Sequence, residues 1–126
     1  MSIIVQKFGG TSIADTHHIF NVAKKAIAFY NEGNDVIVVV SAQGDTTDKL
    51  ILKAKELGKI SSKREMDVLL STGEQISASL LAMAIQSFNI PAVSLTGWQV
   101  GITTNNCHSD AKITSINKKR IQKRIR

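Results

Sequence analysis

The feature that most constrains the fold is a run of five β-branched residues, Val36-Ile37-Val38-Val39-Val40. Such side chains lose rotamer freedom in a helix and fit the pleated surface of a sheet, so the run predicts a strand. No polar residue alternates with them, which is typical of a strand covered on both faces in a parallel sheet. A second β-prone run, from Ile3 to Phe8, ends at Gly9-Gly10 and predicts a strand followed by a tight turn.

Helical spacing of apolar residues fills much of the remaining chain. We expect helices at residues 15–31, 46–57, 65–70 and 74–88. The last of these is apolar most of the way round and is expected to be well buried. Met66, in the helix expected at 65–70, and Met83, in the last helix, are both expected in the core. Residues 90–95 predict another strand that has Pro91 at its start. This order of elements predicts an α/β fold, with a mostly parallel sheet and helices on both faces.

The positive charge is confined to one end of the chain. The net charge is +6, and six of the 16 Lys and Arg residues lie in the last ten residues, which hold no acid. The remaining body is electrically balanced and does not resemble a protein that binds a phosphate backbone, so no nucleic-acid partner is expected. Toward this end of the chain, isoleucines at positions 113, 116, 121 and 125 are interpreted as one face of a basic helix.

The composition indicates a cytoplasmic protein with no membrane partner. No apolar run approaches the ~20 residues of a membrane span. The chain begins without a basic leader and apolar stretch, so no secretory signal is expected. Cys107 is the single cysteine and cannot form an internal disulfide. Cys107, His108 and Asp110 lack a distant fourth ligand, so we expect no metal site there.

Ligands of open α/β sheets bind beyond the carboxyl ends of the strands, and a polar segment follows the first strand there. Gly9 and Gly10 let the backbone approach a phosphate closely, while Thr11 and Ser12 add hydroxyl donors near a helix start. Lys7 adds an ammonium group. The alternative is an ordinary strand-to-helix turn with a solvated lysine. The segment is not a P-loop, because no G-x-x-x-x-G-K-[ST] pattern is present.

Two further polar segments have both a capping and a binding interpretation. In residues 41–48, Asp45 or Thr46 is a candidate N-cap, and Asp48 suits the first turn of a helix. In residues 71–75, Ser71 and Glu74 have the spacing of a capping box. The polar cluster of 41–48 is larger than capping requires, and Glu74 is alternatively placed to hold a substrate ammonium group.

Taken together, the segments resemble the motifs of aspartate kinases, members of the amino acid kinase family. Residues 7–12 resemble the family's K-F-G-G-T-S signature, residues 41–50 its second motif and residues 70–75 its third. Further matches to the family pattern are Leu95-Thr96-Gly97, Gln99, Ile102-Thr103-Thr104, His108 and Ala111-Lys112-Ile113. The resemblance extends from residue 1 to about residue 125. Gln43 stands where family members usually have methionine.

The resemblance implies ATP-dependent phosphorylation of the L-aspartate side chain to 4-phospho-L-aspartate, with Mg²⁺ as cofactor of ATP. This reaction opens lysine, threonine and methionine biosynthesis. It implies a catalytic role for Lys7 at the transferring phosphoryl group, and ATP or phosphate contacts from Lys7, Phe8, Gly9, Gly10 and Ser41. Substrate contacts are implied for Thr11, Ser41, Asp45, Thr46, Thr47 and Glu74. No general base is required, because the acceptor carboxylate is already ionised near pH 7.

The resemblance also implies that residues 1–126 form the N-terminal portion of a catalytic domain, without the C-terminal nucleotide-binding half and the ACT regulatory domains. We therefore expect the isolated chain to be inactive, and complete enzymes to be homo-oligomers. Three alternatives stay open. In the first, the chain belongs to a family member that acts on glutamate, acetylglutamate or a nucleotide. In the second, it is a non-catalytic module that pairs its sheet edge with a full-length kinase subunit. In the third, its basic tail binds nucleic acid.

Overall fold

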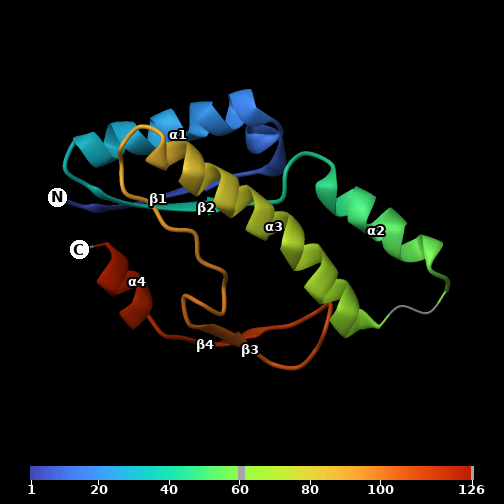
Figure 1. Ribbon diagram of the computed structural model, residues 1–126. Coiled ribbons are helices and arrows are strands. Elements are labelled where there is room, and N and C mark those ends of the chain that lie inside the picture. The colour runs from blue at the N-terminus through green and yellow to red at the C-terminus, as the bar shows by residue number, and fades with distance from the viewer. Residues whose placement is uncertain (60–61, 126) are drawn as a thin grey trace.

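A computed structural model describes residues 1–59 and 62–125 (Figure 1). The elements in chain order are β1 (Ile3–Phe8), the 3-10 helix η1 (Gly10–Ile13), α1 (Thr16–Asn31), β2 (Asp35–Val40), α2 (Thr46–Glu56), α3 (Lys63–Gln86), β3 (Ile102–Thr104), β4 (Ile113–Ile116) and α4 (Lys119–Arg124). Strands β1 and β2 pair in parallel, with Ile3 opposite Asp35 and Phe8 opposite Val40. The predicted α/β class with a parallel sheet is therefore confirmed.

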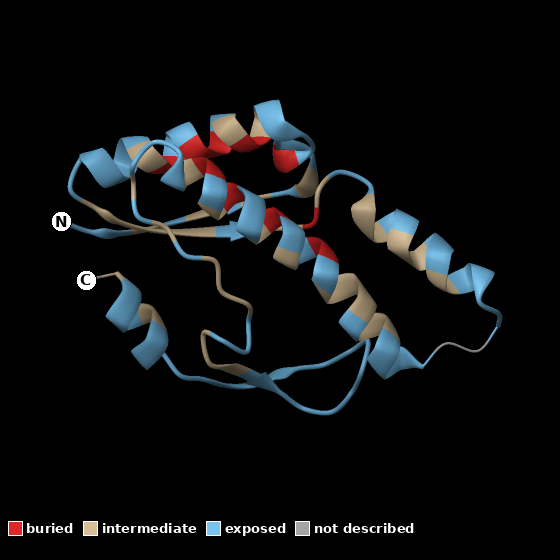
Figure 2. Ribbon diagram, viewed as in Figure 1, coloured by how far each residue is buried: buried red, intermediate tan, exposed pale blue. Residues whose placement is uncertain are grey.

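The core lies between helices α1 and α3 and one face of the β1–β2 sheet. Its buried members are Ile13, Ile19, Val22, Ala23, Leu81 and Ala84. Phe8, Val38 and Val40 pack against this cluster from the sheet. Figure 2 shows that the buried positions concentrate where α1 and α3 meet. Each large aliphatic side chain buried in this way contributes roughly 1.5–3 kcal/mol relative to leaving it in water.

The opposite face of the sheet is open. Ile3, Val5 and Val39 point to this face, and 63% of the Val5 surface is accessible. The β-branched run predicts cover on both faces, but the described helices that contact the sheet pack on the Phe8 side. We call the surface formed by Ile3, Val5, Lys7 and Val39 the open face.

Helix α1 begins where the sequence predicts, because Asp15 caps it. The Asp15 carboxylate accepts a hydrogen bond from the His18 backbone N–H at 2.9 Å, and the His18 ring Nδ1 lies 2.7 Å from the same oxygen. These two bonds hold the pKa of the Asp15 carboxyl below its ordinary value of 3.8. At the other end, Gly33 adopts a positive φ of 88°, which ends the helix at low steric cost.

The expectation of two helices at 65–70 and 74–88 is wrong, because α3 is continuous from Lys63 to Gln86. Its N-cap is Ser62, which accepts from the Glu65 N–H. Ser71 is not a cap, since its hydroxyl donates to the Val68 carbonyl at 2.7 Å within the same helix. A serine bonded back to the preceding turn satisfies itself without ending the helix, so the capping-box interpretation of Ser71 and Glu74 fails.

Helix α3 is also less buried than its composition suggests. Gly73, Ser77, Leu81 and Ala84 lie on its buried side, whereas Ile76 is exposed and Met83 is 55% accessible. The prediction of Met83 as a core residue is therefore wrong, and Met66 is half-buried. By length and composition α3 would suffice to cross a membrane. One such helix is weak evidence for a membrane span, and the buried side of α3 packs against α1.

Two predictions for the C-terminal part are corrected. Residues 90–95 form no strand, and within the described residues the parallel sheet consists of β1 and β2 alone. The segment pairs with neither of these strands, and a strand requires a hydrogen-bonded neighbour. Ile113 and Ile116 lie in β4, which pairs antiparallel with β3, and not on a helix face. Helix α4 starts only at Lys119. The loop between β3 and β4 contacts α3, since the Ser109 N–H donates a hydrogen bond to the Asp67 carboxylate at 2.9 Å.

Leu81→Ala tests the position of the core. Leu81 is 4% accessible, whereas its neighbour Leu80 on the same helix is 36% accessible. We expect Leu81→Ala to lower the free energy of unfolding by about 2–5 kcal/mol, because it leaves a cavity under α1. Leu80→Ala, which removes the same atoms, should cost about 1 kcal/mol or less. Urea unfolding of both variants measures the difference, and equal losses would show that α3 packs through another face.

Candidate functional site

Two turns meet at the edge where both parallel strands end. Strand β1 continues through Gly9 into η1, and β2 continues through Ser41 and Ala42 toward α2. The turns are bonded directly, because the Gly44 N–H donates to the Gly10 carbonyl at 2.9 Å. Gln43 adds a second link through its side-chain amide, which donates to the Ile13 carbonyl at 2.9 Å. The first two polar segments of the sequence are thus held together as one rim.

Ala42 is the point where this rim also meets α3. A Cβ atom added to Gly10 would lie 2.5 Å from the Ala42 carbonyl oxygen, and one added to Gly73 would lie 2.9 Å from the Ala42 Cβ. Both distances are shorter than a side chain tolerates. Ala42 itself is buried. Glycine is therefore required on both sides of Ala42, and the middle of α3 is packed directly onto the rim.

The third polar segment is part of a helix and not a loop. Gly73 lies inside α3, and a Cβ added there would be 3.5 Å from the Thr46 methyl group at the start of α2. Glu74, the next residue, is exposed. It is therefore carried by the stretch of α3 that packs against the rim, while Thr46 and Thr47 occupy the first turn of α2 and are half-buried.

Lys7 and Phe8 point to opposite faces of the sheet. The Phe8 ring packs against the core, and the Lys25 ammonium lies 5.9 Å from the centre of that ring. The Phe8 backbone carbonyl accepts a hydrogen bond from the Ser41 N–H at 3.3 Å. Lys7 is exposed on the open face, and no ion pair within the described residues engages its ammonium group. Of these two residues, Lys7 is the one whose side chain is free to meet a ligand.

The start of α2 only partly follows the capping interpretation. Asp45 occupies the N-cap position but its side chain makes no capping bond, and Asp48 lies in the first turn as predicted. The Asp45 carboxylate instead lies 3.2 Å from the Lys49 ammonium, with both side chains exposed. Such a pair is worth about 0.2–1 kcal/mol. Asp45 can therefore exchange this contact for another at little cost.

The structure gathers most of the candidate residues at this rim. Gly9, Gly10 and Thr11 follow β1, Ser41 follows β2, Asp45, Thr46 and Thr47 begin α2, and Glu74 lies beside Gly73 of α3. Among the described residues, no hydrogen bond or ion pair joins the side chains of Lys7, Thr47 and Glu74 to one another. A single pocket shared by these three side chains stays a prediction.

The rim offers no ready-made metal cage. Within residues 1–59 and 62–125, no three His, Cys, Asp or Glu side chains cluster closely enough to hold a metal ion. Mg²⁺ that binds together with phosphates takes most of its oxygen ligands from them and from water, and needs only one or two protein carboxylates.

Three residues that shape the rim were not identified as such from sequence. Ala42 and Gly73 have no polar group, and only their spatial contact reveals them. Gln43 stood out as a departure from the methionine usual in aspartate kinases. Its amide makes a bond to the Ile13 carbonyl that a methionine thioether, which has no donor, could not make.

Comparison with known proteins supports a specific family. The model of the amino acid kinase family matches residues 2–126. An aspartokinase of Geobacillus stearothermophilus is 54% identical over 123 residues, which are 98% of this chain and 30% of that protein. Aspartokinase 2 of Bacillus subtilis (strain 168) is 53% identical over 116 residues, 92% of this chain and 28% of that protein. The chain thus spans less than a third of the length of these curated relatives.

The fold comparison agrees with the sequence comparison. The crystal structure of aspartate kinase from Synechocystis superposes with a TM-score of 0.76 at 50% identity, covering 80% of this chain and 17% of that one. At this level of identity the likeness extends beyond a shared architecture to the residues themselves.

A pair of glycine substitutions tests the packing of the rim. We expect Gly10→Ala to lower the free energy of unfolding by about 1–3 kcal/mol, because the new methyl group meets the Ala42 carbonyl. Gly9→Ala is the matched control, since Gly9 has a φ of −77° and nothing lies within 4 Å of its added Cβ. Its effect should stay within about 0.5 kcal/mol. Equal effects in chemical denaturation would contradict the contact between Gly10 and Ala42.

Proposed function

Since the chain belongs to the amino acid kinase family, we propose that it carries the phosphate- and aspartate-binding part of an aspartate kinase. The complete enzyme would transfer the γ-phosphoryl group of ATP to the side-chain carboxylate of L-aspartate and release 4-phospho-L-aspartate. This would be the first step toward lysine, threonine and methionine, carried out in the cytoplasm. The observation that carries the proposal is the packing of Gly10 and Gly73 onto Ala42, which brings three polar segments to one rim.

The rim suits the chemistry of phosphoryl transfer, in which a protein mainly positions the reactants and neutralises charge. Lys7 would place its ammonium against the transferring group. The Gly9 and Gly10 carbonyls already accept bonds from Ser12 and Gly44, so the N–H groups of this turn are what it would offer to a phosphate. Ser41 would lie between phosphate and amino acid, because it follows β2 beside the end of β1.

The amino acid would be held by the α2 and α3 side of the rim. We assign the substrate ammonium group to Glu74, an exposed carboxylate that forms no ion pair within the described part of the chain. The hydroxyls of Thr11, Thr46 and Thr47, together with Asp45, would surround the remaining polar atoms. The attacking carboxylate of aspartate is ionised near neutral pH, so no side chain has to remove a proton from it.

Mg²⁺ would enter with ATP, where it neutralises phosphate charge. Complete enzymes would be homo-oligomers. The isolated chain spans about 30% of the length of its relative from Geobacillus stearothermophilus, and we infer that alone it lacks kinase activity.

A second candidate function is favoured by the open face. Ile3, Val5 and Val39 are exposed there, as expected of a surface that packs against further polypeptide. The chain could therefore act as a non-catalytic module that associates with a full-length kinase subunit. A related enzyme acting on glutamate, acetylglutamate or a nucleotide is a third candidate, which acceptor specificity distinguishes.

A chimera tests the kinase proposal. Residues 1–125 would replace the matching segment of the Geobacillus stearothermophilus aspartokinase, and the product would be trapped as the hydroxamate. We expect ATP-dependent product with L-aspartate, and no product from the isolated 126-residue chain. In the chimera, Lys7→Gln should lower kcat by about 10²–10³, because it removes a positive group that stabilises developing charge.

Lys24→Gln is the control, because it removes the same charge from an exposed position on α1. An unchanged kcat in Lys7→Gln would reject the catalytic role of Lys7. Preference of the chimera for glutamate over aspartate would reject the assigned substrate, and turnover by the isolated chain would reject its proposed inactivity.

Glu74→Gln in the same chimera tests the site of the substrate ammonium group. We expect KM for L-aspartate to rise by about tenfold, because an amide replaces a charge-assisted hydrogen bond, while KM for ATP changes little. Glu56→Gln, at the end of α2, is the control and should leave both values unchanged. Steady-state kinetics measures all four constants. A rise in KM for ATP alone would place Glu74 on the nucleotide side.

A further inference from the structure

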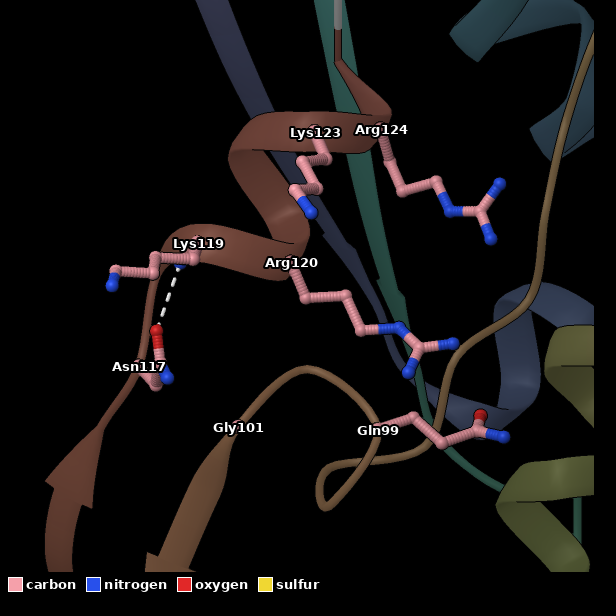
Figure 3. Close-up of a pocket in the computed structure, with 7 residues that line it drawn as sticks. All are labelled: Gln99, Gly101, Asn117, Lys119, Arg120, Lys123 and Arg124. Carbon is pink, nitrogen blue, oxygen red and sulfur yellow. Dashed lines mark hydrogen bonds between the residues drawn. The ribbon is translucent and has the colours of Figure 1, made fainter.

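A basic cavity lies beside the C-terminal helix, away from the rim. It has a volume of about 590 Å³ and is open to solvent, since its polar and charged lining side chains are all exposed. Four of its lining residues, Lys119, Arg120, Lys123 and Arg124, come from α4, and Gln99 and Asn117 line it from neighbouring segments. Figure 3 shows Arg120, Lys123 and Arg124 extending from α4 on the side of Gln99, whereas Lys119 points away. We call this the α4 cavity.

The two amide side chains also present donors. The Gln99 Oε1 atom accepts from the Thr96 N–H at 2.9 Å, and the Asn117 Oδ1 atom accepts from the Lys119 N–H at 3.1 Å. Each oxygen is therefore occupied by backbone, which leaves the NH₂ group for a ligand. The polar side chains of the α4 cavity consequently offer hydrogen-bond donors and positive charge, the combination that suits an anion.

The positive charge of α4 has no internal compensation. Among the described residues, no acidic side chain pairs with any of its four cationic groups. Lys119 and Lys123 are four residues apart, as are Arg120 and Arg124, and like charges at this spacing repel and weaken a helix. A bound anion would relieve that repulsion.

A solvated basic helix face is the ordinary alternative. Lys123 and Arg124 lie in the last turn, where the helix dipole favours positive charge whether or not a ligand binds. The dipole does not explain Arg120 in the first turn, which Figure 3 shows on the side of Gln99. Arg120 therefore favours a binding site.

The α4 cavity is separate from the proposed catalytic rim. In Figure 1, α4 lies toward the ends of β1 and β2 where the strands begin, near the N-terminus of the chain. The rim lies at the opposite ends of the same strands, where β2 leads into α2. An anion in the α4 cavity would therefore not be the phosphate held by Lys7 and the glycine turn.

We propose that the α4 cavity binds a polyphosphate chain. Arg120 and Arg124 offer forked donors that match phosphate oxygens in pairs, and Lys123 adds a point charge. Three such groups spread over one cavity suit a chain of linked phosphates better than a single ion. The ligand is either an inorganic polyphosphate or the phosphate moiety of a nucleotide, which share this chemistry.

Calorimetric titration of the 126-residue chain with sodium triphosphate tests the proposal, at constant ionic strength near physiological salt and without Mg²⁺. We expect saturable binding of one triphosphate, and Arg120→Gln should weaken it by about tenfold. Lys119→Gln removes the same charge from the same helix, but its side chain points away, so a loss below threefold is expected. Arg120→Lys keeps the positive charge but loses the paired N–H donors of the guanidinium group. Its loss of triphosphate affinity should lie between the losses of Arg120→Gln and Lys119→Gln. Circular dichroism checks that each variant keeps its fold.

Further arms of the titration identify the ligand and the place of binding. ATP binding as tightly as triphosphate, with no binding of adenosine, would support recognition of the phosphate chain from a nucleotide. Tight binding of triphosphate together with weaker binding of ATP would support inorganic polyphosphate as the ligand. Lys24→Gln should leave triphosphate affinity unchanged, because Lys24 is exposed on α1 and lines neither the α4 cavity nor the rim.

Four results would overturn the proposal. Equal losses in Arg120→Gln and Lys119→Gln would show attraction by net charge alone. Loss of binding in Lys7→Gln would place the anion at the rim. Monophosphate binding as tightly as triphosphate would exclude recognition of a chain, and a single-stranded oligonucleotide binding tenfold more tightly than triphosphate would make α4 a nucleic-acid surface.

Discussion

The close packing of Ala42 between two glycines is the constraint on which the candidate site depends. Gly10 and Gly73 are 63 residues apart in sequence, and each would collide with Ala42 if it carried a side chain. Because neither does, the turn after β1, the turn after β2 and the middle of α3 approach within van der Waals contact. The backbone packing also brings the side chains next to these three points, including Glu74 and Thr46, close to the same edge. Bonds between the polar side chains are therefore not needed to hold them near one another.

Elements with a strong local signal could be predicted from the sequence. Strand β2 follows from its β-branched run, and α1 follows from the helical spacing of its apolar residues. The polar stretch 71–75 was misread because its residues also have local meanings that do not apply. The Ser71 hydroxyl bonds within its own helix, and Gly73 lies inside that helix where it packs against Ala42. Both facts depend on tertiary structure, which a local pattern does not contain.

The C-terminal part shows why a β-prone segment is not yet a strand. Residues 90–95 and Ile113–Ile116 both have strand-like composition, but only the second finds a partner, in β3. A strand is defined by hydrogen bonds to a neighbour, so the outcome is decided outside the segment. The proximity of the two turns that follow β1 and β2 was more predictable than these elements, since the carboxyl ends of neighbouring parallel strands lie at the same edge of a sheet. The binding roles of the residues in those turns stay a prediction.

Lys7 connects the chemistry of the rim with the open face of the sheet. It shares that face with Ile3, Val5 and Val39, while Phe8 turns toward the core. An ammonium group in water interacts weakly with a phosphate, because the high dielectric constant screens both charges. Any polypeptide layer that covers the exposed valines and isoleucine would also remove water from around Lys7 and would strengthen the phosphoryl contact that we propose for it. Covering the hydrophobic face and strengthening that proposed contact would then be one structural event.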